Sequence, residues 1–171
     1  DGPDEFRRVA RTMCREGVDI LKINVSGDSG VPASPADATV MTEVEVAAVC
    51  EVAHAHGKRL AAHARSSASV KLCLKHGVDV IYHATLVDHE AKDLLEAARE
   101  RVFIAPVIGH LLTTLHDAPK FGISRSAKHQ RALESEIEAG IENMRDLKRR
   151  GVRILPGGDY GFAWNPNGTN A

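Results

Sequence analysis

Short apolar runs alternate with amphipathic, helix-like segments from one end of the chain to the other, and few folds accept that order. The runs occupy residues 18–26, 58–64, 78–84, 102–108 and 151–159. Each interval between them is long enough to hold a helix and none resembles a tight hairpin, which predicts a parallel sheet. Because the runs are almost continuously apolar, we expect both faces of the sheet to be covered.

A parallel sheet with helical crossovers is either doubly wound or part of a (β/α)8 barrel. A complete barrel takes roughly 250 residues, so the observed units would make about five-eighths of one. No G-x-G-x-x-G or phosphate loop follows the first run, which makes a flavodoxin-like or other nucleotide-binding domain the weaker alternative. We therefore expect an α/β chain that forms a partial TIM barrel.

Capping residues indicate where helices begin. Thr42 and Glu45 form a capping box for a helix that runs to about His56, and Asp88 is the expected N-cap of a helix over 88–101. Residues 27–39 are rich in Gly, Pro, Ser and Asp and predict a long loop. A second, polar loop is expected after the run that ends at residue 108. Further helices are expected over 3–17, 66–77 and 126–150.

Composition excludes several classes of protein. The chain is 43% hydrophobic with a net charge of -1, as in ordinary globular proteins, and no run approaches the roughly 18 apolar residues of a membrane span. The absence of a basic block argues against nucleic-acid binding. The three cysteines form no C-x-x-C pair, so buried free thiols and a reducing, cytoplasmic location are expected. The sequence does not fix the oligomeric state, and a homo-oligomer is possible.

Polar residues that can bind metals recur near the carboxyl ends of the runs, where active sites of parallel α/β folds gather. Lys22, His63, His83 and Asp159 hold these positions. Each has a plainer interpretation by itself. A strand-end histidine is often only hydrogen-bonded, a lysine at the rim can reach solvent, and an aspartate after two glycines suits a turn or a helix cap. Their recurrence at one edge favours a shared site.

The segments "LKI", "AAHA", "IYHA" and "GGDYG", in that order, resemble the metal-binding strands four, five, six and eight of the amidohydrolase superfamily. The closing "NPNGTNA" is similar to the loop before the last helix in its imidazolonepropionase-like and Xaa-Pro dipeptidase-like branches. The resemblance covers nearly the whole chain. It implies that residues 1–171 are the C-terminal portion of one barrel domain, without the N-terminal strands and the last helix.

The resemblance also implies roles for these residues. His63 and His83 would bind the second of two divalent metal ions, Lys22 carboxylated on its amine would bridge the two ions, and Asp159 would bind the first ion and accept a proton. The expected reaction is hydrolysis of an amide, peptide or cyclic amide C–N bond by metal-activated hydroxide. Its substrate would be a small amide or a dipeptide. Histidine and carboxylate ligands suit zinc, although other first-row metals remain open.

Carboxylation of Lys22 requires a neutral amine. We expect burial among Ile20, Leu21 and Ile23 to favour that form by lowering the lysine pKa.

The chain departs from the family pattern in one respect. The first strand of the family supplies a His-x-His pair, and no such strand end precedes Lys22. "HAH" at 54–56 lies at a helix end, so His54 and His56 are expected to be surface residues. A non-catalytic structural or binding segment, inactive alone because the pair is absent, is therefore the alternative function.

Three residues are weaker candidates for substrate contact. His110 and His116 follow the fourth run, in a loop expected at the active-site edge. Arg65 could bind a substrate carboxylate through two hydrogen bonds, although a surface salt bridge is the plainer interpretation. Strand alternation is expected to turn Tyr82 away from the metal. Loop 27–39 and three aromatic residues could shape a pocket, or the aromatic residues could simply pack together; they are Tyr160, Phe162 and Trp164.

Overall fold

The computed structural model describes residues 2–29 and 33–168. Within these residues five strands form one sheet in the order β1-β2-β3-β4-β5, and every neighbouring pair is parallel. The strands are β1 (Ile20–Asn24), β2 (Arg59–Ser66), β3 (Val80–Leu86), β4 (Phe103–Ala105) and β5 (Arg153–Ile154). Spatial order follows chain order without the reversal that defines a doubly wound sheet. The partial barrel is confirmed, and the flavodoxin-like alternative is wrong.

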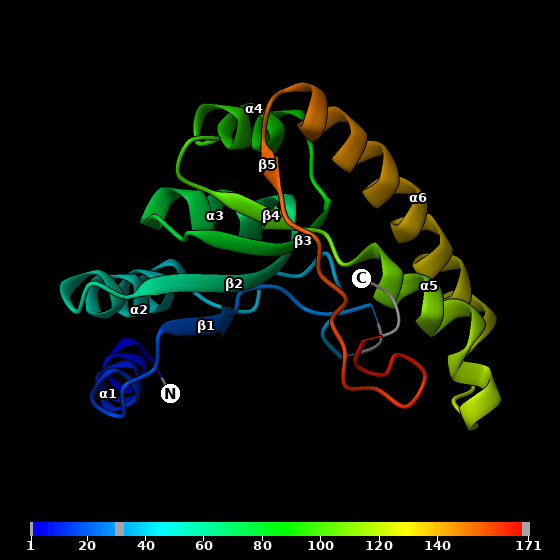
Figure 1. Cartoon of the computed structure of the whole chain (residues 1–171), viewed down its shortest axis with the longest axis horizontal. Coiled ribbons are helices and arrows are strands. Elements are labelled where there is room, and N and C mark those ends of the chain that lie inside the picture. The colour runs from blue at the N-terminus through cyan, green and yellow to red at the C-terminus, as the bar shows by residue number, and fades with distance from the viewer. Residues whose placement is uncertain (1, 30–32, 169–171) are drawn as a thin grey trace.

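Helices fill every crossover between the strands (Figure 1). They are α2 (Glu43–Ala55), α3 (Ser67–His76), α4 (His89–Ala97), α5 (Ile108–His116), the 3-10 helix η1 (Ala118–Phe121) and α6 (Ala127–Arg149), and a further helix, α1 (Pro3–Arg15), precedes β1. The expected caps are present: the Thr42 N–H donates to Glu45 Oε2 at 2.9 Å, and Asp88 Oδ1 accepts from the Ala91 N–H at 2.8 Å. The helix expected over 88–101 ends earlier, at Ala97.

Helix α5 replaces the polar loop expected after the fourth run. Pro106 follows β4 directly, and Val107 takes a left-handed conformation with φ 50° that turns the chain into the helix. The apolar residues Ile108, Leu111 and Leu115 then recur at helical spacing and pack against α6. The fourth strand is therefore shorter than the apolar run 102–108. The last residue of that run belongs to the buried face of a helix.

The core lies between the sheet and the helices on its outer side. Strand β1 shows the division clearly, because Leu21 and Ile23 are buried among residues of the helices while Lys22 and Asn24 are exposed. The opposite, inner face of the sheet is thus open at β1, and the expectation that both faces are covered is wrong there. Helices α2, α3 and α6 contact the strands directly.

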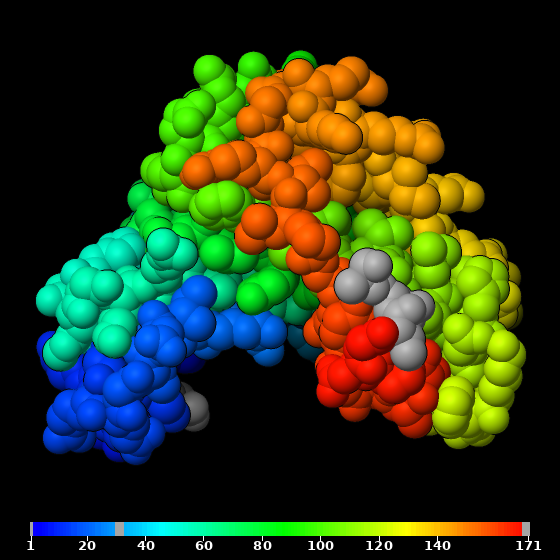
Figure 2. All heavy atoms as spheres, in the orientation of Figure 1, coloured from blue at the N-terminus to red at the C-terminus, as the bar shows by residue number. Residues whose placement is uncertain are grey.

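The open side of the barrel is visible as a hollow in the molecular surface (Figure 2). The α1–β1 region, in blue, borders it on one side, and residues 156–168, in orange to red, border it on the other. The carboxyl ends of β1, β2 and β3 approach this hollow (Figure 1). Of the candidate site residues on the sheet, Lys22 is exposed, whereas His63 and His83 are buried.

Two further sequence expectations concern thiols and membranes. Cys50 and Cys73 are buried free thiols, and burial raises their pKa to about 11 and about 12. Cys14 is a free thiol that is only partly buried. Among the described residues no helix combines the length and apolar character needed to cross a membrane.

Candidate metal centre

Strand register places several polar side chains on the inner face of the sheet. Asn24 pairs with His63 and His63 with Tyr82, so these three side chains share a face, and Lys22 joins them two residues before Asn24. The Lys22 Nζ atom lies over the Tyr82 ring, 5.0 Å from its centroid. The expectation that alternation turns Tyr82 away from this face is wrong.

His83 reaches the same face through an irregularity in β3. Ala64 pairs with His83, but Ser66 pairs with Leu86, so β3 holds one extra residue between these two pairs. His83 and Ala84 take left-handed conformations with φ 78° and 49°. Regular alternation would have sent the His83 ring toward the helices. Instead it meets the His63 ring edge to face, with 4.4 Å between the ring centroids.

One hydrogen bond fixes which nitrogen of His63 carries the hydrogen. His63 Nε2 lies 2.8 Å from the carbonyl oxygen of Gly27. Because a carbonyl can only accept, Nε2 must donate, and a neutral ring then leaves Nδ1 with a free electron pair. Burial lowers the pKa of His63 and favours that neutral form. This is the state in which an imidazole binds a metal ion.

His83 is also held as a neutral ring. Only 3% of its surface is exposed, and burial, with a smaller effect from the nearby Arg65 charge, lowers its pKa well below the ordinary value. Its Nδ1 atom is buried and has no hydrogen-bond partner among the residues that the structure describes. An unpartnered buried nitrogen is costly. Two adjacent neutral imidazoles, one of them unsatisfied, fit a divalent metal ion as nitrogen donors.

Lys22 lies near this pair but is not buried as expected. Leu21 and Ile23 point to the opposite face, and Ile20 is 43% exposed at the start of the strand. The Lys22 charge contributes to the lowered pKa of both His63 and His83, which places it in their neighbourhood. The structure therefore brings Lys22 and the two histidines to one face, but it does not shield the amine.

Asp159 stands apart from the histidine pair. It is exposed on the loop after β5, where its carbonyl oxygen accepts from Asn165 Nδ2 at 3.0 Å. Burial lowers the pKa of His110, and the charge of the neighbouring Asp159 opposes that shift. Across residues 2–29 and 33–168, no three His, Cys, Asp or Glu side chains converge on a point where they could hold a metal ion. The fit to a metal thus rests on His63 and His83.

Arg65 is buried, so the surface salt bridge considered for it is wrong. Its side chain is fully enclosed, and Nη1 donates to Glu136 Oε1 at 2.7 Å while Nη2 donates to Asp28 Oδ2 at 3.3 Å. Glu136, which is 3% exposed, went unnoticed in the sequence. A signal was available, since it interrupts the apolar face of α6 between Leu133 and Ile137.

A pocket of about 400 Å³ is lined by Asp28, whose carboxylate lies 3.9 Å from His63 Nε2, although neither histidine of the pair lines it. His110, expected in a loop, lies in α5 and lines this pocket with its ring 4.6 Å from that of Phe162. His116 is exposed at the last residue of α5. Arg125 lines the pocket too, and sequence reasoning did not select it because nothing local marks it. Other lining residues are Asn24, Asp28, Thr114 and Trp164.

A profile of the amidohydrolase family matches residues 3–168. The chain belongs to the amidohydrolase family. The resemblance expected from "LKI", "AAHA", "IYHA" and "GGDYG" is thereby confirmed at the level of the family. No curated protein matches the chain.

Solved structures support the amidohydrolase fold. A Xaa-Pro dipeptidase with methionine bound in its active site is 27% identical, with a TM-score of 0.77 over 98% of this chain and 40% of that one. A prolidase complexed with N-methylphosphonate-L-proline is 23% identical, with a TM-score of 0.84 over 96% of this chain and 40% of the other. An ochratoxinase from A. niger is 19% identical, with a TM-score of 0.82 over 93% and 35%. The chain spans two-fifths or less of the length of these structures.

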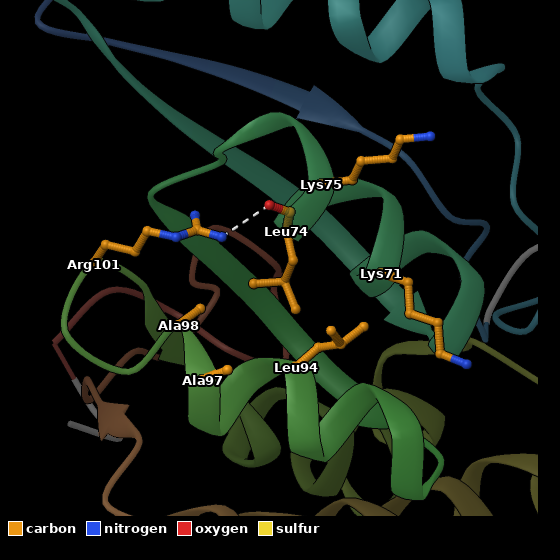
Figure 3. A pocket seen from close by; sticks show the side chains of 7 residues that line it. All are labelled: Lys71, Leu74, Lys75, Leu94, Ala97, Ala98 and Arg101. Carbon is orange, nitrogen blue, oxygen red and sulfur yellow. Dashed lines mark hydrogen bonds between the residues drawn. The ribbon is translucent and has the colours of Figure 1, made fainter.

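A second hollow of this amidohydrolase chain, about 380 Å³ in volume, lies between α3 and α4 (Figure 3). Its floor is apolar, and its cations already have partners. Lys71 pairs with Glu90 and Lys75 with Glu43, while Arg101 donates to the carbonyl oxygen of Leu74 at 2.9 Å. Because these cations are already paired, the inner face of the sheet remains the candidate site.

Proposed function

We propose that the protein hydrolyses the C–N bond of a small amide or dipeptide, with His63 and His83 holding a divalent metal ion. The observation that carries this proposal is the pair of neutral, adjacent imidazoles at the carboxyl ends of neighbouring strands in an amidohydrolase-family chain. A divalent ion bound there would polarise the substrate carbonyl and activate water near neutral pH. Zinc suits nitrogen donors of this kind.

Lys22 and Asp159 complete the proposed donor set. Carboxylation would change Lys22 from a repelling cation into an anionic oxygen ligand on the face that it shares with His63. Asp159 would accept a proton from water and return it to the leaving amine. Its present neighbour is His110, so this role requires the loop after β5 to bring the carboxylate closer to the histidine pair.

The pocket lined by Asp28 and His110 suggests the substrate class. Its volume of about 400 Å³ falls within the range of small-molecule sites. Phe162 and Trp164 stack with 5.2 Å between ring centroids and offer an apolar wall, while Arg125 offers a guanidinium that could pair with a carboxylate. A dipeptide or N-acyl amino acid presents both features. The bound methionine and proline phosphonate of the related structures support this choice.

Within this proposal, residues 1–171 form the C-terminal portion of one barrel domain. The support is that the chain covers 35–40% of the ochratoxinase, prolidase and dipeptidase structures and aligns over nearly all of its own length. Substrate would enter from the concave side seen in Figure 2.

The direct test removes one donor at a time from the intact protein. His63→Ala, His83→Ala and Asp159→Ala are assayed against a panel of dipeptides and N-acyl amino acids, with metal content measured by mass spectrometry. We expect both histidine variants to lose metal and all three to lose turnover. His54→Ala is the matched control, because His54 lies exposed in α2, and it should match the unmodified protein. Full turnover in His83→Ala would refute the role assigned to that residue.

The absence of a three-donor cluster among the described residues favours one alternative, a non-catalytic binding segment. The same measurements separate the two functions. An intact protein that holds no stoichiometric metal and cleaves none of the panel supports the binding segment.

A further inference from the structure

A buried ion pair connects the candidate metal site to helix α6. Arg65, at the end of β2, and Glu136, in the middle of α6, are 71 residues apart in the sequence, yet Nη1 and Oε1 lie 2.7 Å apart. Arg65 is fully buried and Glu136 is 3% exposed. Replacing a buried ion pair by apolar residues is often neutral or stabilising. The pair therefore calls for an explanation other than stability.

Both members of the pair also contact the loop that follows β1. Glu136 Oε2 accepts a hydrogen bond from the Ser29 hydroxyl, and Arg65 Nη2 donates to Asp28 Oδ2 at 3.3 Å. The backbone N–H of Arg65 donates to Ser26 Oγ at 2.9 Å. The segment 26–29 is thus held at both ends, and Gly27 lies between the held residues.

Gly27 contributes the carbonyl that orients His63. Its oxygen accepts from His63 Nε2 at 2.8 Å, and this bond leaves Nδ1 as the nitrogen able to bind metal. Glu136 also accepts from Thr85 Oγ1 at 2.6 Å, two residues after His83 in the irregular part of β3. The Glu136 carboxylate therefore bonds one side chain near each histidine's support: Ser29, two residues after Gly27, and Thr85, two residues after His83.

We propose that Glu136 is a positioning residue for the metal site. Through Arg65 and Ser29 it holds the Gly27 carbonyl against His63 Nε2, and through Thr85 it holds the turn that directs His83 inward. This inference rests on the proposed function, because it assigns His63 and His83 as metal ligands. Partners that orient a metal-binding histidine typically change metal affinity about 10- to 100-fold when they are removed.

The experiment measures zinc affinity of the intact protein by competition with a chromogenic chelator. Glu136→Gln keeps the shape of the side chain and removes its charge, and we expect zinc affinity to fall about 10- to 100-fold. Glu138→Gln is the matched control, since Glu138 is exposed on the same helix, and it should bind zinc as the unmodified protein does. Nitrogen NMR of labelled histidine in the metal-free protein should show loss of the single His63 tautomer in Glu136→Gln.

A double variant separates positioning from simple stabilisation. Arg65→Met with Glu136→Leu replaces the ion pair by apolar groups and leaves no buried charge unpaired. If the double variant is as stable as the unmodified protein and still binds zinc weakly, Glu136 acts by positioning. Wild-type affinity in both the double variant and Glu136→Gln overturns the inference.

His63→Ala serves as the reference for the proposed function. If it binds zinc as tightly as the unmodified protein, the proposed metal site itself is wrong. If it loses zinc while the Glu136 variants keep it, only the positioning inference fails.

Discussion

The pH dependence of stability offers a direct check on the buried state of His83. Burial holds the folded-state pKa of this ring well below the ordinary value of about 6.5, which the unfolded chain should retain. As pH falls below that value the unfolded chain takes up a proton that the folded state does not. The contribution of His83 is therefore fully present above pH 6.5 and is lost progressively as pH falls toward the folded-state pKa.

The size of the effect follows from the two protonation curves. If the folded ring stays neutral, one histidine with an unfolded pKa of 6.5 lowers the free energy of unfolding by about 1.4 kcal/mol between pH 7.5 and 5.5. Carboxylate groups contribute little in this range because their ordinary pKa values lie near 4. The buried His63 and the half-buried His110 also have lowered pKa values and add to the total in the same direction.

The assay is urea unfolding of the metal-free protein at pH 7.5 and 5.5. His83→Asn keeps a residue that tolerates the left-handed backbone at φ 78°, and it removes the titrating ring. We expect the loss of stability on acidification to be smaller by up to about 1.4 kcal/mol in this variant. Ile81→Val is the control, because it opens a small cavity in the same buried strand without changing an ionisable group. An unchanged acid sensitivity in His83→Asn would show that His83 is not held neutral.

Three further outcomes are expected. Glu136→Leu alone leaves Arg65 with only its Asp28 contact and should lower the free energy of unfolding by about 3–5 kcal/mol, measured by urea unfolding, whereas adding Arg65→Met should restore most of the loss. Arg125→Met should raise KM at least about 10-fold for substrates with a free carboxylate and leave KM for their amidated counterparts unchanged, as measured by steady-state kinetics; an equal change for both would contradict the pairing. The buried Cys73 thiol, with its pKa raised to about 12, should resist iodoacetamide in the native protein and react after unfolding, as followed by mass spectrometry.

Local sequence patterns determined the architecture because they record which residues must be buried. The spacing of apolar residues separated strands from helices, and the length of each crossover required parallel pairing. Caps at Thr42 and Asp88 depend on contacts within a few residues, so their positions could be predicted. The segments around His63 and His83 also carried the family resemblance, since those residue types occur at strand ends where an active site gathers.

Only the tertiary structure decided where several side chains point. His83 faces His63 because β3 has an extra residue relative to β2, and that shift depends on pairing between strands. Tyr82 faces inward because it pairs with His63 in the regular part of the ladder, before that extra residue. The exposure of Lys22 follows from the open inner face of the sheet, which the apolar character of its neighbours did not reveal.

The burial of Arg65 depends on a still more distant part of the chain, whereas the place of Asp159 depends on a contact within its own loop. Arg65 can be enclosed because helix α6 brings Glu136, 71 residues later, against its guanidinium and pairs the buried positive charge. Asp159 lies in the loop after β5. Asn165 Nδ2 holds this loop by donating to the backbone carbonyl oxygens of Gly158 and Asp159. Sequence periodicity therefore determined which residues reach the site edge, while long-range contacts decided which of them meet there, because such contacts leave no local pattern to read.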